Sequence, residues 1–387
     1  MITLHGITWD HTRGYDPLIA VNADHAGACP QVQVIWDKRS LKDFGDYPIA
    51  LLAERYDLLV LDHPFMARAY EDGILVDLCR HIGGHDLLAR AKASVGQSHQ
   101  SYEYKGTWQA LAVDAAAQVA AARDDLLGDL GLPTPRSFEE VLELARHLPH
   151  GMHIASTMKP ADLFSTFLGL CAQLAGTSFF DPESAFPPAL GEESVALLRK
   201  LLAACHPESL NMNPIEMLEH MALQDDIVYC AYLYGYTNYS RARYRPRLIT
   251  FHDAPLLPGA RASTLLGGTG LAVSRRCAHP DAAAAYILHA TGTAVQTGVY
   301  YRGGGQPADI HAWRDPAINA DCNFFFLNTL NTLENAYVRP KVPAWNVFQE
   351  KGGDLLNALL RTDIAEKDIA VQLGDLYRNI NSARAQH

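Results

Sequence analysis

The stretch GGTGLAVS at residues 267–274 decides the fold, together with the segment HPDAAAAYILH at residues 279–289 that follows it. A glycine-rich turn that enters an apolar strand lets backbone amides approach a ligand closely. Asp281 stands behind Pro280, and we expect it to cap a helix over residues 282–289. Such units are common in α/β proteins, so this one becomes specific only when it is combined with a second segment.

The second segment is YKGTWQALAVDAAAQVAAARDDLL, residues 104–127. It predicts an aromatic-rich turn, a short strand over residues 111–113, and a long helix after Asp114. Together the two segments indicate paired crossovers between the lobes of a two-lobed binding fold. We therefore expect discontinuous lobes, with residues 1–110 and 263–315 in lobe I and residues 111–262 and 316–387 in lobe II.

Length, charge and cysteine content exclude several classes of protein. A chain of 387 residues exceeds what one hydrophobic core usually serves, and it has no run of eighteen apolar residues that would insert into a membrane. The formal net charge of -11 disfavours nucleic acid and anionic membrane surfaces as partners. The seven cysteines are odd in number and never form C-x-x-C, so neither a disulfide framework nor a cysteine zinc site is expected.

The start of the chain bears on location. Met1 is followed directly by the strand-like ITLHGITW of residues 2–9, without a basic region, an apolar leader or a cleavage site. As written, the chain is expected in the cytoplasm, and dispersed cysteines favour the same reducing compartment. The alternative is a mature form whose leader has been replaced by methionine. That form would be periplasmic, with an ABC transporter permease as a partner.

Strands and helices alternate over the first hundred residues. Strands are predicted at residues 2–9, 32–36 and 58–61, with a helix capped by Asp16 that ends near Gly27 and a short helix over residues 48–55. The result is a β-α-β-α-β unit with a parallel sheet.

The second lobe is predicted from helix signals and short strands. Ser137 and Glu140 form a capping box, Gly176 ends a helix over residues 160–175, and Asn213 with Pro214 opens another. A surface loop is expected over residues 181–191, a helix from 192 to about 205, and strands at 152–155, 227–233 and 248–251.

With these residues in view, the chain resembles the family 1 extracellular solute-binding proteins, the maltose-binding-like receptors of ABC sugar importers. The resemblance rests on the LAVD of residues 111–114, the GGTGLAVS segment with its helix, the GGGQP turn of residues 303–307, and Arg339-Pro340 ahead of Trp345 and Gln349. It implies a type II periplasmic-binding-protein-like fold, in which two α/β lobes joined by a hinge close over a ligand in the cleft between them.

In open parallel sheets, sites lie beyond the carboxyl ends of the strands. The candidates there are Trp9, Asp10 and His11 after the first strand, Lys38 with Arg39 after the second, and Asp62 with His63 after the third. Carboxylate and imidazole together would serve as a metal site or as an acid/base pair. The competing interpretation is polar ligand recognition, or capping of the helices that follow.

Further candidates for contact with the ligand come from both lobes. They are Tyr104, Asp114, Ser156, Thr157, Tyr234, Tyr236, Asn238, Gly268, Thr269, Gly270, Arg302, Gln306 and Trp345. Tyr234, Tyr236 and Asn238 follow a strand whose earlier tyrosines, Tyr229 and Tyr232, are assigned to packing.

Two hypotheses follow. The first is a binding protein that closes around a small polar organic ligand such as a sugar, a sugar acid or a related acid. The second is a cytoplasmic enzyme on the same fold, a lyase, hydrolase or isomerase, with Asp10, His11, Asp62 or His63 as acid/base groups. The chain contains no G-x-S-x-G elbow, no P-loop, and no G-x-G-x-x-G after the first strand. No cofactor and no metal are assigned from the sequence.

Overall fold

The computed structural model describes residues 1–384 and divides them into two compact units. Unit 1 comprises Met1–Ala116, Gly267–Asn319 and Lys341–Pro343, and unit 2 comprises Ala117–Leu266, Ala320–Pro340 and the described part of 344–387. The chain passes between the units within strand β6 (Ala110–Ala122) and at the start of strand β10 (Leu266–Val273). Every helix within residues 1–384 is too short or too polar to cross a lipid bilayer.

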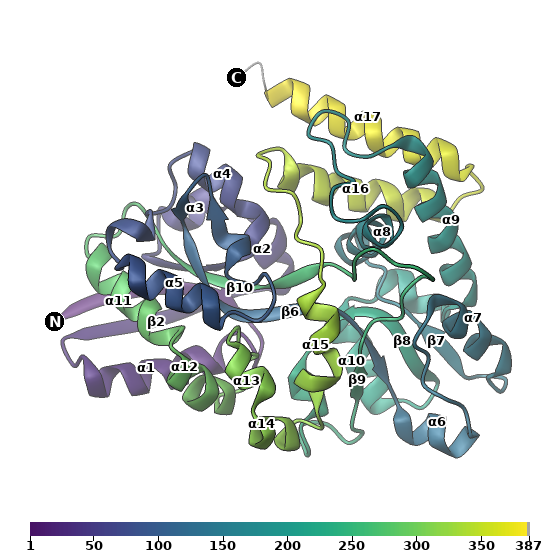
Figure 1. The fold of residues 1–387 in the computed structure, drawn as a ribbon, viewed down its shortest axis with the longest axis horizontal. Coiled ribbons are helices and arrows are strands. Elements are labelled where there is room, and N and C mark those ends of the chain that lie inside the picture. Colours follow the sequence, from purple (N-terminus) through teal and green to yellow (C-terminus); the bar gives the residue numbers. More distant parts are fainter. Residues whose placement is uncertain (385–387) are drawn as a thin grey trace. The chain divides into compact units, whose positions relative to one another are not determined.

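A mixed sheet forms the centre of unit 1. Strand β1 (Ile2–Trp9) pairs in parallel with β2 (Val32–Arg39) and with β3 (Leu58–Leu61), and β10 runs antiparallel to β3. The order is β2-β1-β3-β10-β6. Helix α1 (Asp16–Ala28) packs beside α11 (Pro280–Ala290) (Figure 1). The core between sheet and helices includes Leu4, Val34, Leu58, Leu271 and Tyr286, so the predicted β-α-β-α-β unit is confirmed.

Short elements complete unit 1. They are α2 (Leu41–Asp46), α3 (Ile49–Ala53), η1 (His63–Phe65), α4 (Met66–Glu71), η2 (Leu78–Arg80), α5 (Gly84–Ala93), η3 (Gln100–Tyr102), the hairpin of β4 (Glu103–Tyr104) and β5 (Thr107–Trp108), α12 (Thr293–Val295), η6 (Gln296–Tyr300), α13 (Ile310–Arg314) and the start of α14 (Pro316–Asp321).

Unit 2 is built on the second half of β6, with β8 (Ile227–Tyr234) antiparallel to it and β7 (His153–Ala155) parallel to β8. Strand β9 (Thr250–His252) also pairs with β6. Helix α16 (Trp345–Leu360) packs on α8 (Pro160–Ala175) and α17 (Glu366–Arg384), and α17 packs on α9 (Pro188–Ala204) (Figure 1). The remaining elements are α6 (Asp124–Leu130), α7 (Phe138–His147), η4 (Pro207–Asn211), α10 (Pro214–Leu223), η5 (Thr237–Ser240) and α15 (Phe325–Glu334).

The helix predicted after Asp114 is wrong. Residues 115–122 continue strand β6, and all thirteen residues of that strand are buried. Alanine has a high helix propensity, but this run has no polar stripe, so both of its faces belong in a core. Small side chains there pack under neighbouring elements while the backbone pairs with β8 and β9. Pairing within the sheet therefore overrides the local preference for helix.

Three smaller predictions also need correction. The N-cap residues of α1 and α11 are Tyr15 and His279, and Asp16 and Asp281 lie in the first turns instead. There they still complement the helix dipole. The predicted loop over residues 181–191 ends earlier, because Pro188 at the first helical position begins α9. The glycines of residues 267–270 lie inside β10 and form no turn.

Candidate functional site

The predicted edge of unit 1 is formed where β1, β2 and β3 end. These strands are adjacent and parallel, so their last residues lie at the same edge of the sheet. Lys38 Nζ lies 2.8 Å from Asp10 Oδ1, with 44% of the lysine side chain and 60% of the aspartate side chain exposed. The hydrogen bond to Asp10 raises the pKa of Lys38. This edge therefore presents an ammonium donor beside a carboxylate acceptor to solvent.

Asp62 and His63 also lie at this edge, but they differ in access. Asp62 Oδ1 accepts the backbone N–H of His63 at 2.8 Å and so caps helix η1. The same oxygen is 3.1 Å from Nδ1 of His63, whose side chain is fully buried and meets the ring of Tyr102 edge-on. The side chain of Asp62 keeps 22% exposure. Asp62 can therefore reach a ligand, whereas His63 positions Asp62.

The loop after β1 contains a residue that sequence reasoning missed. Arg13 Nε donates to Asp114 Oδ2 at 2.8 Å, and Arg13 Nη2 donates to Asp114 Oδ1 at 2.6 Å. Burial raises the pKa of Asp114, and the charge of Arg13 opposes this shift. His11 Nδ1 accepts the Arg13 N–H at 3.0 Å. Asp114 thus anchors the loop of Asp10 and His11, and no sequence spacing indicated Arg13 as its partner.

The side chain of Trp9 is also largely buried. Trp9 is 4% exposed and its ring packs against Phe44, so it supports this edge of the sheet from the protein interior. Tyr104 is half-buried in the β4–β5 hairpin, where its ring meets Tyr70 at a centroid distance of 5.4 Å. Lys105 Nζ also lies over this ring, 5.2 Å from its centroid.

The glycine-rich segment packs against β6. Gly268 has a φ of +95°, and a Cβ there would lie 2.8 Å from Ala115 Cα. A Cβ at Gly270 would lie 2.7 Å from the ring of Tyr102. Thr269 between them is 5% exposed. These glycines allow close approach of neighbouring protein groups, which is the structural role seen for the segment.

The GGGQP turn has a similar role. Gln306 is fully buried, and its side-chain Nε2 donates to the main-chain carbonyl of Ala115 at 2.8 Å. The main-chain carbonyl of Gln306 accepts the N–H of Ala115 at 3.1 Å. Arg302, four residues earlier, is exposed. Of this pair, Arg302 remains accessible to a ligand and Gln306 joins the turn to β6.

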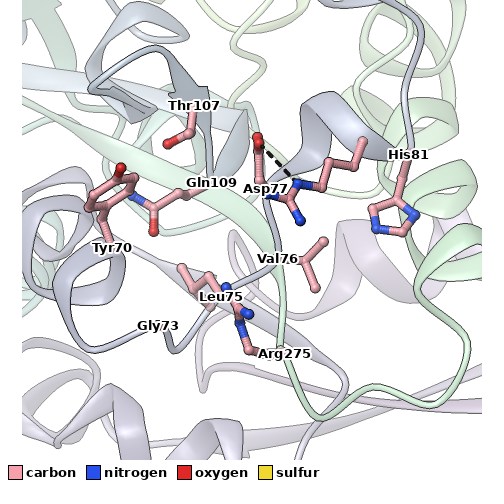
Figure 2. A pocket seen from close by; sticks show the side chains of 10 residues that line it. Tyr70, Gly73, Leu75, Val76, Asp77, His81, Thr107, Gln109 and Arg275 are labelled. Atoms are coloured by element: carbon pink, nitrogen blue, oxygen red, sulfur yellow. Dashed lines mark ion pairs between the residues drawn. The ribbon is translucent and has the colours of Figure 1, made fainter.

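Unit 1 also has a cavity of about 440 Å³ that none of the predicted residues line. Figure 2 shows Tyr70, Thr107 and Gln109 on one side and Arg275 and His81 on others, with Asp77 and Arg80 forming a 3.8 Å ion pair. The volume lies in the range of small-molecule sites. The lining comes mostly from the segment of residues 73–81 around η2, with further residues from α4, from the end of the hairpin and from the loop after β10.

In unit 2, the tyrosines in and after β8 differ in burial. Tyr229 and Tyr232 are buried, and their hydroxyls donate to the carbonyls of Pro135 and Pro255. Tyr234 is half-buried at the end of the strand, with its hydroxyl 3.4 Å from Ser165 Oγ. Tyr236 and Asn238 are only 6% and 3% exposed. Tyr234 is thus the most accessible aromatic group of this set.

The remaining candidates of unit 2 lie in its interior. Ser156 and Thr157 are fully buried, and both hydroxyls donate to the carbonyl of Tyr232, at 3.2 and 3.0 Å. Trp345 is fully buried, and its Nε1 donates to Gln349 Oε1 at 3.2 Å. These three side chains hold β7, β8 and α16 in place.

Among the residues that the structure describes, one group has the donors and proximity to hold a metal ion. It consists of His206, His220 and Asp226, which the sequence analysis did not consider. The three residues come from separate elements of unit 2, and their spacing in the sequence follows no metal-binding motif.

No protein-family model and no curated protein matches the sequence. Solved structures do match. The maltose-bound MalE3 protein of T. maritima is 16% identical with a TM-score of 0.84, covering 98% of this chain and 100% of that one. An ABC transporter solute-binding protein from Agrobacterium radiobacter, in complex with ribitol, is 18% identical with a TM-score of 0.80 and 98% coverage of both chains.

A third similar structure is an ABC transporter solute-binding protein from Thermotoga lettingae bound with alpha-D-tagatose. It is 14% identical with a TM-score of 0.82, covering 98% of this chain and 100% of that one. The chain therefore has the two-lobed α/β fold of periplasmic solute-binding proteins, as its sequence predicts.

Proposed function

We propose that this chain is a solute-binding protein that holds a small polar organic ligand, a sugar or a related polyol or sugar acid. The observation that supports this most strongly is the similarity of fold over 98% of the chain to proteins described with maltose, ribitol and tagatose. We further propose that it acts in the periplasm and delivers its ligand to an ABC transporter permease, because two of these proteins are described as ABC transporter solute-binding proteins.

The accessible polar groups of unit 1 support a hydroxylated ligand. Asp10 and Lys38 place an acceptor and a donor 2.8 Å apart, and the partly exposed Asp62 adds a second acceptor at the same edge. Sugar hydroxyls are both donors and acceptors, so such a mixed set pairs with them fully. Hydrogen bonds to charged groups are also stronger than those between neutral groups.

Unit 2 contributes an aromatic group. Tyr234 is partly exposed at the end of β8, where its ring can cover the apolar face of a sugar. In unit 1 we propose Asp10, Lys38 and Asp62 as ligand contacts. In unit 2 we propose Tyr234 as a candidate contact that is tested separately. The buried residues Trp9, His63 and Asp114 then support the contacts of unit 1 from the interior.

The direct test is a binding screen of the full chain. Maltose, ribitol, tagatose, sugar acids and aromatic acids are added one at a time, and thermal unfolding is followed. A ligand at about a hundredfold over its Kd should stabilise the folded chain by about 2.7 kcal/mol. Hits are then titrated calorimetrically. Absence of saturable binding across sugars, polyols and acids would refute the proposal.

Variants locate the site. Asp62→Ala should weaken binding of a hit by about tenfold or more, since a hydrogen bond to a charged group contributes about 1.5–3 kcal/mol. Asp62→Asn keeps an oxygen that can cap η1, so it separates lost capping from lost ligand contact. Asp315→Ala is the matched control, because Asp315 Oδ1 also caps a helix of unit 1, accepting the Ala317 N–H at 2.8 Å.

Tyr234 is tested in the same way. Tyr234→Ala should weaken binding, whereas Tyr234→Phe keeps the ring and should largely preserve it. If neither Asp62→Ala nor Tyr234→Ala alters affinity, the proposed contacts are wrong. Product analysis after incubation addresses the enzyme hypothesis, which predicts conversion of a bound sugar by the unaltered chain and its loss in Asp62→Asn.

A further inference from the structure

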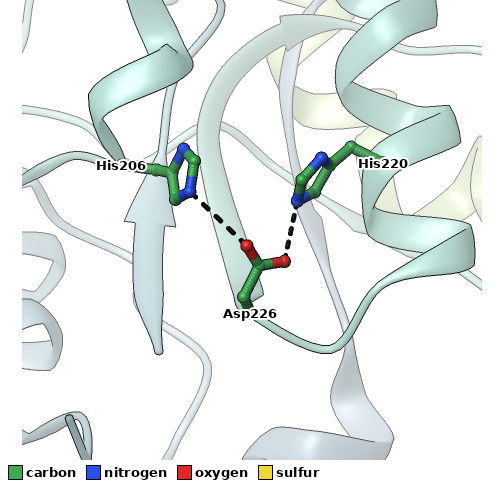
Figure 3. A group of neighbouring side chains, drawn as sticks. All are labelled: His206, His220 and Asp226. Atoms are coloured by element: carbon green, nitrogen blue, oxygen red, sulfur yellow. Dashed lines mark hydrogen bonds and ion pairs between the residues drawn. The ribbon is translucent and has the colours of Figure 1, made fainter. Parts of the chain in front are cut away.

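Three side chains with metal-binding donors meet at the amino end of β8 in unit 2. His206 directly precedes η4, His220 lies in α10, and Asp226 directly precedes Ile227 of β8. Figure 3 shows the carboxylate of Asp226 between the two imidazole rings. Its Oδ1 lies 2.7 Å from Nε2 of His220, and its Oδ2 lies 3.4 Å from Nε2 of His206. One donor atom from each residue lies within 4.8 Å of the others.

Main-chain hydrogen bonds fix the segments that present these donors. The His206 N–H donates to the carbonyl of Ile154 at 2.7 Å, and the carbonyl of Asp226 accepts the His153 N–H at 2.7 Å. Helix α10 begins with a capping box of Asn213 and Glu216. The donors therefore converge from elements with defined positions, so little ordering is needed to bind an ion.

We propose that His206, His220 and Asp226 bind a divalent first-row transition metal ion such as Zn²⁺. Two imidazoles with one carboxylate suit Zn²⁺, Cu²⁺ or Ni²⁺, whereas Mg²⁺ and Ca²⁺ prefer oxygen ligands alone. Donor atoms on a tetrahedral Zn²⁺ lie about 3.3 Å apart. The 3.4 Å separation of His206 Nε2 and Asp226 Oδ2 is close to that value, and the 2.7 Å separation of His220 Nε2 and Asp226 Oδ1 is a hydrogen bond that an ion would replace.

The site is open enough to admit an ion. The side chains of His206, His220 and Asp226 are 15%, 23% and 37% exposed. Solvent therefore reaches the cluster and supplies the remaining ligands as water. Asp225, the adjacent acid, pairs with Arg123 and Arg247 instead and leaves Asp226 to the histidines.

Binding requires a proton shift in each imidazole ring. His220 Nε2 lies 2.7 Å from Asp226 Oδ1, so the proton of its neutral ring lies on Nε2 and moves to Nδ1 when an ion binds there. His206 Nδ1 accepts the Glu208 N–H at 3.2 Å, so in the neutral ring the proton lies on Nε2, facing Asp226. When an ion binds at Nε2, that proton moves to Nδ1. The Glu208 N–H then bonds to water, which is possible because Glu208 is exposed. No proton is gained or lost by either ring in this exchange.

The proposed metal site lies apart from the aromatic group proposed to bind a sugar. The cluster is at the amino end of β8 and Tyr234 is at its carboxyl end, so the eight residues of the strand separate them by roughly 26 Å. An ion at the cluster would join η4, α10 and β8 within unit 2. Its role is therefore to stabilise the unit.

The test uses the full chain, freed of metal with a chelator, in the absence of any sugar. Calorimetric titration with ZnCl₂ should show one saturable equivalent, and the melting temperature should rise with Zn²⁺. His206→Gln, His220→Gln and Asp226→Asn should each weaken binding at least tenfold. His85→Gln is the control for surface histidines, since the His85 side chain is 95% exposed in α5, and it should leave binding unchanged.

A second control separates ligation from packing. The His153 ring packs edge-on against His206 at a centroid distance of 5.0 Å without belonging to the donor group, so His153→Gln should retain most of the affinity. Crystals of the unaltered chain soaked with Zn²⁺ give a readout that does not depend on how the variants fold, and anomalous density should appear between the three side chains. No saturable binding, equal affinity in His220→Gln, or anomalous density only elsewhere would overturn the proposal.

Discussion

Arg13 and Asp114 form a two-point ion pair inside unit 1, although 101 positions separate them in the chain. Their side chains are 5% and 0% exposed. Both charges are removed from water, so each depends on the other for compensation. Since Arg13 lies three residues after Asp10, this pair fixes the loop that follows β1 to strand β6. The exposed edge of Asp10 and Lys38 is thus supported by a buried charge pair.

Breaking that pair should be strongly destabilising. Asp114→Ala leaves the Arg13 guanidinium buried without its partner and should lower the free energy of unfolding by about 3–5 kcal/mol. The double variant Arg13→Met, Asp114→Leu removes both charges and should be clearly more stable than the single one. Urea unfolding of the full chain measures both. A loss below about 1 kcal/mol in Asp114→Ala would mean that the pair contributes no more than a surface salt bridge.

A matched pair of glycines tests the packing role of the GGTG segment. Gly268 and Gly73 both have positive φ, of +95° and +61°, but a Cβ at Gly73 meets no atom within 4 Å. Gly73→Ala should therefore cost about 1 kcal/mol for backbone strain alone. Gly268→Ala adds an overlap with the backbone of Asp114 and Ala115 and should cost several times more. Equal melting temperatures for the two variants would contradict this assignment.

Local signals with a single physical cause were predictable from the sequence. Helix α8 ends at Ala175 because Gly176, with a φ of +86°, follows it. The capping box of Ser137 and Glu140 also forms as expected. The buried strand of residues 58–61 is confirmed as β3, since four apolar residues in a row suit a parallel strand covered on both faces.

Burial was the property that sequence position could not supply. The residues after β1 and β3 lie at one sheet edge as expected, yet His63 is fully buried while Asp62 is partly exposed. The alanine run of β6 predicts a helix from sequence alone, because its pairing with β8 and β9 depends on residues more than a hundred positions away. Arg13, the cavity and the His206 cluster likewise depend on contacts between distant segments.

The buried His99 should make stability depend on acid pH. It is 3% exposed and neither ring nitrogen has a hydrogen-bond partner among the described residues. Burial, with the nearby charge of Arg90, lowers its pKa to about 3 from 6.5. Between these values the unfolded chain binds one more proton than the folded chain. The contribution of His99 to the free energy of unfolding should therefore fall by about 1.4 kcal/mol per pH unit below about pH 6.

Comparison of variants isolates this effect from other titrating groups. His99→Leu removes the buried imidazole and should reduce the slope of unfolding free energy against pH between pH 4 and 6. His85→Gln, at a side chain that is 95% exposed, should leave the slope unchanged. An unaltered slope in His99→Leu would show that this ring is protonated equally in both states.

Asp162 should make the free energy of unfolding depend on pH in the opposite direction. It lies in the first turn of α8, where the helix dipole favours a negative charge, but it is only 8% exposed. Burial and the charge of Glu216 raise its pKa to about 7 from 3.8, although Lys159 opposes them. Between these values the folded chain binds the additional proton, so the contribution of Asp162 to stability is present at low pH and decreases as pH rises through this window.

Asp162→Asn removes the loss of stability at higher pH, because the amide stays neutral at every pH. The variant should be more stable than the unaltered chain at pH 8, by up to about 4 kcal/mol for a shift of this size, and close to it in stability at pH 4. Asp129→Asn, at an exposed acid of α6, is the control and should change little at either pH. Urea unfolding at the two pH values measures the difference. If Asp162→Asn were less stable at pH 8, the carboxylate would be ionised in the folded chain and stabilised there by the helix terminus and Lys159.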